Sequence, residues 1–201
     1  MHVITTGNHV WDRWDSRKVL GGNRNILRPL NYPRENGGNG FVVYELEGKA
    51  KVGVINVQGR TYMQPLDDPF KAVDWALGKI NEQTKISVID FHAEATAEKI
   101  AMGWYIDGRV SALIGTHTHT PTADAKILPR STAYITDVGM SGPYDSVIGM
   151  KKEQAVQRFL KQTPHKYETA TNDVHLCAVV IEVEIETGKA VKIEQIIFPK
   201  F

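Results

Sequence analysis

The chain has a single cysteine, no long hydrophobic run and almost no net charge, and each absence excludes a class of protein. Cys177, in an apolar run, cannot form an intramolecular disulfide, so we expect a buried thiol in a fold that suits a reducing compartment. The apolar runs are far shorter than a membrane span, and the first residues lack the basic and apolar regions of a signal peptide. We therefore expect a cytoplasmic protein with no membrane partner.

The charge balance also limits the partners. The 24 Lys and Arg residues against 23 Asp and Glu residues leave a net charge of +1, which removes the electrostatic basis for general nucleic-acid binding. Any nucleotide must then be recognised at a local site. With 201 residues the chain is long enough to bury a sizeable core, and we expect one domain over residues 1–201.

The pattern of apolar residues predicts a layered α/β domain. A short strand at 3–6 runs into Gly7, a helix is expected from Trp11 to Leu20, and residues 31–40 read as a loop. Strand, helix and strand over 86–114 form a βαβ unit. The other expected elements are a hairpin at 41–57, a helix at 69–81, short strands at 125–128 and 132–135, a helix at 151–161 and a hairpin at 174–198.

Four histidines fall at the ends of expected strands: His9, His92, His117 and His119. In layered α/β folds ligands bind beyond the carboxyl ends of the strands, so these side chains are expected at one crevice. His117 and His119 are two residues apart and share one side of an extended segment. Neutral imidazole suits Zn, Fe and Mn, which predicts a metal site. Nearby carboxylates that could act as oxygen ligands or support the histidines are Asp90, Glu94, Asp124 and Asp137.

Two of these carboxylates also have simpler interpretations. Asp90 can merely close its strand, and Glu94 can cap the helix that follows it. The tripeptide Gly7-Asn8-His9 has a more specific chemistry, because the glycine permits a tight turn and the Asn8 oxygen can ligate a metal without adding charge. His9 is then placed to donate a proton to a ligand.

The order of the motifs resembles that of the metallophosphoesterase superfamily, in which the blocks GNH(D/E), a central His and GHxH follow one another in this order. Here they read Gly7-Asn8-His9, His92 within residues 90–94, and residues 115–119. The chain is most similar to the YmdB-like branch, the 2',3'-cyclic-nucleotide phosphodiesterases. The similar runs extend over essentially the whole chain and are residues 89–99, 107–112, 115–120 and 136–143.

This resemblance implies a calcineurin-like fold, a sandwich of two mixed β-sheets flanked by helices. It also implies a metal-dependent phosphoesterase that hydrolyses phosphodiesters, 2',3'-cyclic nucleotides above all, with a hydroxide shared between two metal ions. By motif, Asn8, His92 and His117 are expected to bind the first ion and His119 the second, with His9 as the general acid. Fe or Mn is the expected metal, and an N/O site of this kind also accepts Zn.

The chain departs from the family pattern at its start. The family begins with a strand ending in Asp and then a Glu-Asn pair, which complete the first metal site and bridge the two ions; neither block occurs in residues 1–201. We therefore expect an N-terminally shortened chain in which the second ion retains only His119. An alternative is a catalytically weak or inactive module that binds metal or nucleotide, and a third reading gives the histidines purely structural hydrogen bonds.

The expected partner is a small phosphodiester or nucleotide, and a homo-oligomer is compatible with the family. Aromatic side chains that could stack on a base are Trp11, Trp14, Tyr105 and Tyr144, although a place in the core or scaffold is the simpler interpretation of each.

Overall fold

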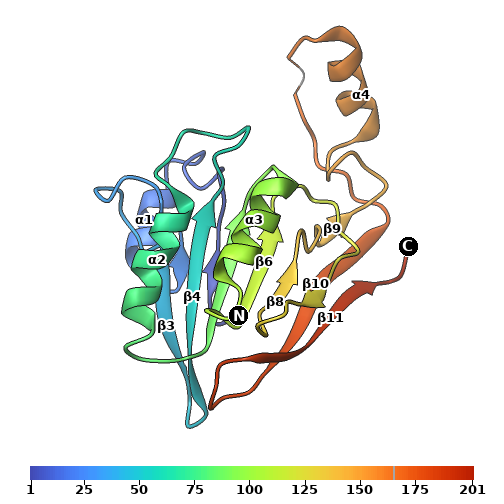
Figure 1. Ribbon diagram of the computed structural model, residues 1–201. Coiled ribbons are helices and arrows are strands. Elements are labelled where there is room, and N and C mark those ends of the chain that lie inside the picture. The colour runs from blue at the N-terminus through green and yellow to red at the C-terminus, as the bar shows by residue number, and fades with distance from the viewer. Residues whose placement is uncertain (165) are drawn as a thin grey trace.

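A six-stranded mixed sheet forms the centre of the computed structural model, which describes residues 1–164 and 166–201 (Figure 1). Its strand order is β3-β4-β5-β6-β8-β7, with parallel pairing from β4 to β8 and antiparallel hairpins at both edges. The expected hairpins and βαβ unit account for this mixture. The strands are β3 (Phe41–Leu46), β4 (Ala50–Gln58), β5 (Ser87–His92), β6 (Ala112–Thr116), β7 (Lys126–Ile127) and β8 (Ala133–Ile135).

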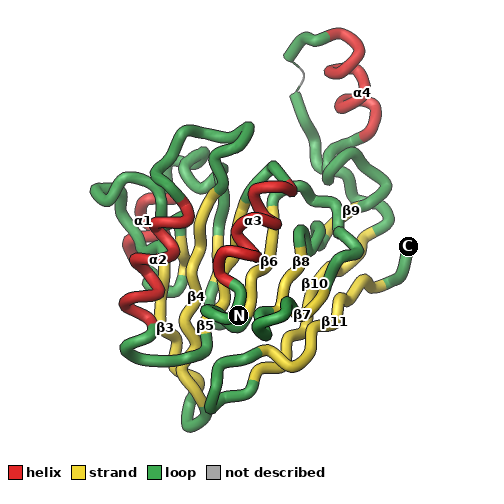
Figure 2. The backbone as a smooth tube through the Cα atoms, in the orientation of Figure 1, coloured by secondary structure: helices red, strands yellow, loops and turns green. Residues whose placement is uncertain are grey.

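Two helices, α2 (Pro69–Ile80) and α3 (Thr96–Ile106), cover one face of this sheet (Figures 1 and 2). The Asp68 carboxylate begins α2 by accepting hydrogen bonds from two backbone N–H groups of its first turn. The apolar stripe of α2 is buried against the sheet, as its spacing predicts. None of the helices in the described residues combines the length and apolar character that crossing a membrane requires.

A second sheet of three antiparallel strands, in the order β11-β10-β9, packs on the opposite face. Small side chains let the sheets approach closely, because Ala112, Ala133 and Ala190 are buried between them. The result is the expected sandwich, although only the larger sheet is mixed as expected and the smaller one is antiparallel throughout. The remaining elements here are β9 (Gly142–Pro143), β10 (Val174–Val183), β11 (Ala190–Phe198) and the projecting helix α4 (Lys152–Lys161) (Figure 1).

The N-terminal segment forms a small parallel pair between β1 (Ile4–Thr5) and β2 (Ile26–Leu27), connected through α1 (Ser16–Gly22). The predicted helical start at Trp11 is wrong, since residues 8–15 form tight turns and the helix begins five residues later. Hydrogen bonds of the i to i+3 type replace helical ones there, for example from Asp12 N to His9 O at 3.1 Å. These turns hold the residues after Gly7 near the end of β1.

Candidate active site

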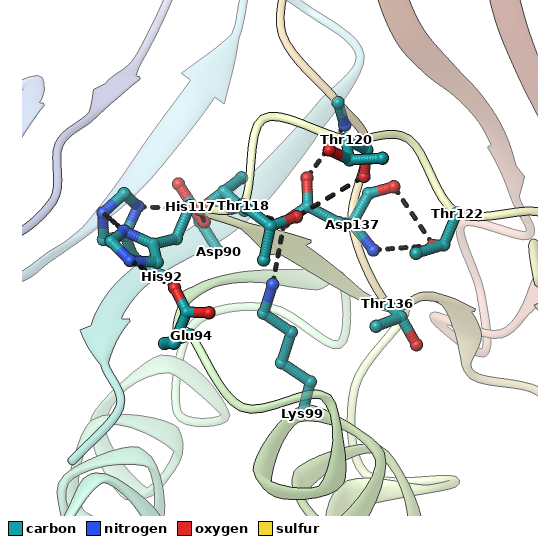
Figure 3. A network of polar contacts seen from close by, with 12 residues as sticks. Asp90, His92, Glu94, Lys99, His117, Thr118, Thr120, Thr122, Thr136 and Asp137 are labelled. Carbon is teal, nitrogen blue, oxygen red and sulfur yellow. Dashed lines mark hydrogen bonds and ion pairs between the residues drawn. The ribbon is translucent and has the colours of Figure 1, made fainter. Parts of the chain in front are cut away.

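Side chains alternate along β5, so that apolar residues face the core and polar residues face the candidate site. Ile89 and Phe91 are fully buried in the cluster shared with the helices, so Asp90 and His92 project from the opposite face of the sheet. The register places Thr116 of β6 beside His92. A polar group therefore gathers on the face away from α2 and α3, at the carboxyl ends of β5 and β6 (Figure 3).

Asn8 reaches this group because Gly7 allows the chain to pass directly over the imidazole of His92. A Cβ atom on Gly7 would lie 2.2 Å from His92 Nε2, a distance that no side chain can occupy. The amide oxygen Oδ1 of Asn8 lies 2.9 Å from the same nitrogen. The glycine of the Gly7-Asn8-His9 motif is thus explained by close approach to the site itself.

His117 approaches from the end of β6 on a strained backbone. Its φ angle is 105°, in the left-handed region that side chains rarely adopt and that is often found at functional sites. Gly115 permits this path, because a Cβ atom there would lie 1.7 Å from the carbonyl oxygen of Thr136. His117 Nδ1 consequently lies 3.1 Å from His92 Nε2.

Hydrogen bonds determine which nitrogen of His92 carries the proton (Figure 3). Desolvation raises the pKa of Asp90 to about 6, so its carboxylate is ionised at neutral pH and accepts the Thr116 hydroxyl proton at 2.7 Å. Thr116 Oγ1 then accepts a hydrogen bond from His92 Nδ1 at 3.0 Å. Desolvation and the neighbouring His117 lower the pKa of His92 to about 3, which keeps the ring neutral. The lone pair of His92 is therefore on Nε2, the nitrogen that faces Asn8.

His117 is oriented by Glu94, whose Oε2 lies 3.0 Å from its Nε2 and accepts that N–H. Desolvation lowers the pKa of His117 although Glu94 opposes the shift, so this ring is neutral as well. Its lone pair then lies on Nδ1 and points toward His92. Glu94 does not cap α3, whose first turn has no side-chain cap. Of the two interpretations of this carboxylate, the structure shows support of a histidine and not helix capping.

Lone pairs on three atoms thus converge: Asn8 Oδ1, His92 Nε2 and His117 Nδ1. His92 Nε2 lies 2.9 Å from Asn8 Oδ1 and 3.1 Å from His117 Nδ1. Ligands at adjacent octahedral positions about 2.1 Å from an ion are about 3.0 Å apart. Three acceptors with no proton between them repel one another unless a cation or a donor lies among them. The donor set therefore fits a transition metal of the kind that accepts imidazole and amide oxygen.

The structure does not bring His119 into this group. Its Nδ1 lies 2.9 Å from the backbone oxygen of Ile148, and its φ angle is 66°. Over residues 1–164 and 166–201, no three side chains of the His, Cys, Asp and Glu types are arranged to hold an ion. The three-ligand group contains two imidazoles and one amide, and a binding role for His119 remains a prediction.

His9, the expected proton donor, lies at the rim with a side chain that is 78% exposed. Its Nδ1 is 2.7 Å from Asp12 Oδ2, which fixes the ring and leaves Nε2 3.5 Å from Asn8 Nδ2. Sequence reasoning missed Asp12, although its i, i+3 spacing from His9 within a turn was a usable signal. An imidazole held by a carboxylate next to a metal ligand is a suitable general acid.

A buried ion pair supports the histidine turn from below (Figure 3): Asp137 is one of the supporting carboxylates expected from the sequence, whereas its partner Lys99 was missed. Asp137 Oδ2 accepts hydrogen bonds from Lys99 Nζ at 2.8 Å, from Thr118 N at 3.0 Å and from Thr118 Oγ1 at 2.8 Å. Thr118 lies between His117 and His119, so Asp137 holds the turn that presents both. The signal was the position of Lys99 on the buried stripe of α3, where Met102 and Ile106 follow at helical spacing.

Comparison with known proteins connects this arrangement to a family. Residues 1–196 match the YmdB-like protein family. The chain is 48% identical over 195 residues to the 2',3'-cyclic-nucleotide 2'-phosphodiesterase of Bacillus subtilis, covering 97% of this chain and 74% of that protein.

Two crystal structures share the fold. A hypothetical protein from Thermus thermophilus is 40% identical with a TM-score of 0.92, covering 98% of this chain and 76% of that one. A novel phosphatase from Mycoplasma pneumoniae is 36% identical with a TM-score of 0.90, covering 98% and 72%. These relationships confirm the predicted fold and the expectation of an enzyme of the phosphoesterase type. The chain belongs to the YmdB-like protein family.

Proposed function

We propose that this protein hydrolyses phosphodiesters in a metal-dependent reaction, with 2',3'-cyclic nucleotides as the substrate class. The convergence of lone pairs from Asn8, His92 and His117 carries the proposal, because it fits a cation and lies beside a carboxylate-held imidazole. The name of the Bacillus subtilis relative supports the substrate class.

In this proposal Asn8 Oδ1, His92 Nε2 and His117 Nδ1 hold a first ion, Fe or Mn in preference to Zn. Such an ion supplies a Lewis acid for the phosphoryl oxygens and lowers the pKa of an attacking water. Thr116 and Glu94 fix the ring orientations, so both imidazoles present lone pairs without rearrangement. His119 remains our candidate ligand for a second ion.

His9 acts on the leaving group. Water gives up one proton to solvent as it adds to phosphorus, the bond from phosphorus to one ribose oxygen breaks, and that oxygen takes the proton from His9 Nε2, which solvent then restores. Asp12 accepts the Nδ1 proton of His9 and so orients the ring with Nε2 toward the leaving group. The product is a nucleoside phosphomonoester, with the other ribose oxygen still bonded to phosphorus.

A second candidate is a weakly active or inactive module that binds one metal or nucleotide. It is favoured by one observation: within the described residues no three side chains of the His, Cys, Asp and Glu types are arranged to hold an ion. For compartment we propose the cytoplasm, since the lone Cys177 is a buried free thiol.

Metal content per chain and hydrolysis of a 2',3'-cyclic nucleotide, measured on the same preparations, test the proposal. We expect His117→Ala to lose bound metal and activity, and His9→Ala to keep the metal while slowing hydrolysis most for poor leaving groups. Metal bound without hydrolysis would support the binding module instead. Unchanged metal content in His117→Ala would refute the ligand assignment.

A further inference from the structure

A second cavity adjoins the one at Asn8, His9 and His92, and the catalytic proposal does not use it. One cavity of about 510 Å³ is lined by Asn8, His9 and His92, and a neighbouring one of about 540 Å³ is lined by Trp11, Trp14 and Arg17. Arg13 lines both cavities, so the two cavities adjoin at this residue. Its volume lies within the range of small-ligand pockets.

The two tryptophans of this second cavity differ in what they contact. Trp11 packs edge-on against Tyr32, with ring centroids 6.2 Å apart, on the cluster that includes the buried Val10 and Leu20, and so forms a fixed wall. Trp14 is 90% exposed. An indole so exposed within a pocket lining has a free face available for stacking.

Basic groups accompany this exposed ring. The guanidinium carbon of Arg17 lies 5.6 Å from the centroid of Trp14. Arg13 and Arg17 outnumber Glu35, the acidic residue of the same cavity lining. The cavity therefore combines an aromatic surface with local positive charge, in a protein whose total charge is only +1.

Backbone turns connect His9 to the segment that carries Trp14. Asp12 N donates to His9 O at 3.1 Å, and Ser16 N donates to Arg13 O at 3.1 Å. Trp14 thus lies within a series of turns that starts at the proposed general acid.

We propose that the cavity of Trp11, Trp14 and Arg17 binds the nucleobase of the substrate, with Trp14 as the stacking surface and Arg13 facing the phosphate. This inference rests on the proposed function, because it takes a nucleotide as the substrate. Every base offers a π face and a tryptophan stacks on any of them. A guanidinium pairs with phosphate and stacks on aromatic rings, which suits it to the border between base and phosphoryl positions.

The same chemistry predicts weak discrimination among bases. The hydroxyl of Tyr32 already donates to Gln64 Oε1 at 2.8 Å, so its proton does not read a base edge. Stacking then sets the order of affinity, with purine nucleotides above pyrimidine nucleotides and both well above a sugar phosphate without a base.

Tryptophan fluorescence tests the inference without activity as the readout. The 201-residue protein is titrated with adenosine 3'-monophosphate, cytidine 3'-monophosphate and ribose 5-phosphate, in the presence of a chelator. The variants are Trp14→Ala and, as a matched control, Trp104→Ala, whose indole is 56% exposed on α3 and lines neither cavity. We expect the nucleotides to quench fluorescence and Trp14→Ala to weaken binding about 10-fold, with Trp104→Ala unchanged.

Equal affinity for ribose 5-phosphate and the nucleotides would overturn the inference, as would full binding in Trp14→Ala. A concentration-dependent dimer that Trp14→Ala abolishes would also overturn it, because a second copy would then cover the ring. Failure of the proposed function is distinguishable. Loss of hydrolysis with nucleotide quenching intact refutes catalysis, whereas hydrolysis with a Michaelis constant unchanged by Trp14→Ala refutes the base site.

Discussion

Lys99 Nζ lies 2.8 Å from Asp137 Oδ2, and the two side chains are only 0% and 1% exposed. A charge at that depth is stable only when it is paired, so Lys99→Met leaves a buried carboxylate without its cation. We expect a loss of about 3–5 kcal/mol in the free energy of unfolding, measured by urea denaturation. Lys79→Met, at an exposed position of α2, is the control. A loss below about 1 kcal/mol would show that the pair is not buried as described.

Glu94→Gln tests how His117 is oriented. The carboxylate accepts the Nε2 proton of His117, and an amide is a weaker acceptor that can also present its N–H₂ group. We expect metal affinity to fall about 10- to 100-fold, measured by competition with a coloured chelator. Glu82→Gln, at an exposed position, should leave the affinity unchanged. Equal affinities in the two variants would remove Glu94 from this role.

Gly7→Ala and Gly21→Ala form a matched pair. The first places a methyl group 2.2 Å from His92 Nε2, whereas the second meets nothing within 4 Å. Gly7→Ala must displace the imidazole, so metal binding should be lost along with part of the stability. Gly21→Ala, in the last turn of α1, should be neutral or add up to about 1 kcal/mol. Thermal unfolding with and without metal separates the two effects, and retained metal binding in Gly7→Ala would contradict the packing of the motif.

The stability of the folded protein is expected to depend on pH through the protonation of His175. Burial of this side chain lowers its pKa, but the hydrogen bonds to Asp173 and Pro199 O outweigh burial and raise the pKa above its ordinary value of 6.5. The folded protein therefore binds the proton more tightly than the unfolded chain does. The stabilisation is complete below pH 6.5 and is lost as the pH rises through the folded pKa.

His175→Gln removes this titration. The difference in unfolding free energy between the protein and His175→Gln should shrink as the pH increases from below 6.5 into the alkaline range. Urea denaturation over that range measures it. A difference that grows with pH would mean that the neutral ring, and not the charged one, is favoured by the fold.

The strand-end histidines could be found from the sequence because periodicity alone reveals where strands stop. His92 and His117 follow apolar runs, and parallel strands end at one edge. The roles of Thr116 and Glu94 could not be found in this way. A hydroxyl on a strand and a carboxylate before a helix have many local partners, and only the tertiary path of His117, with its left-handed backbone, selects these.

At the start of α1 the sequence pattern predicted a helix where the structure has turns. Large side chains at Trp11 and Trp14 imitate a helical stripe, but they belong to turns that follow Gly7, and one ring packs while the other stays exposed. Lys99 was overlooked for a related reason, since a lysine within a helix is expected to reach solvent. In both cases the decisive partners lie far away in the sequence, as Asp137 does from Lys99.

The alternation along β5 has a consequence for how this protein tolerates change. Substitutions at Asp90 or His92 alter chemistry and leave the packing of Ile89 and Phe91 against the helices intact, so activity and folding can vary independently there. Insertion of one residue within β5 has no such freedom. It would turn the imidazole toward the helices and a phenyl ring toward the candidate site, so this strand tolerates point substitutions better than changes of length.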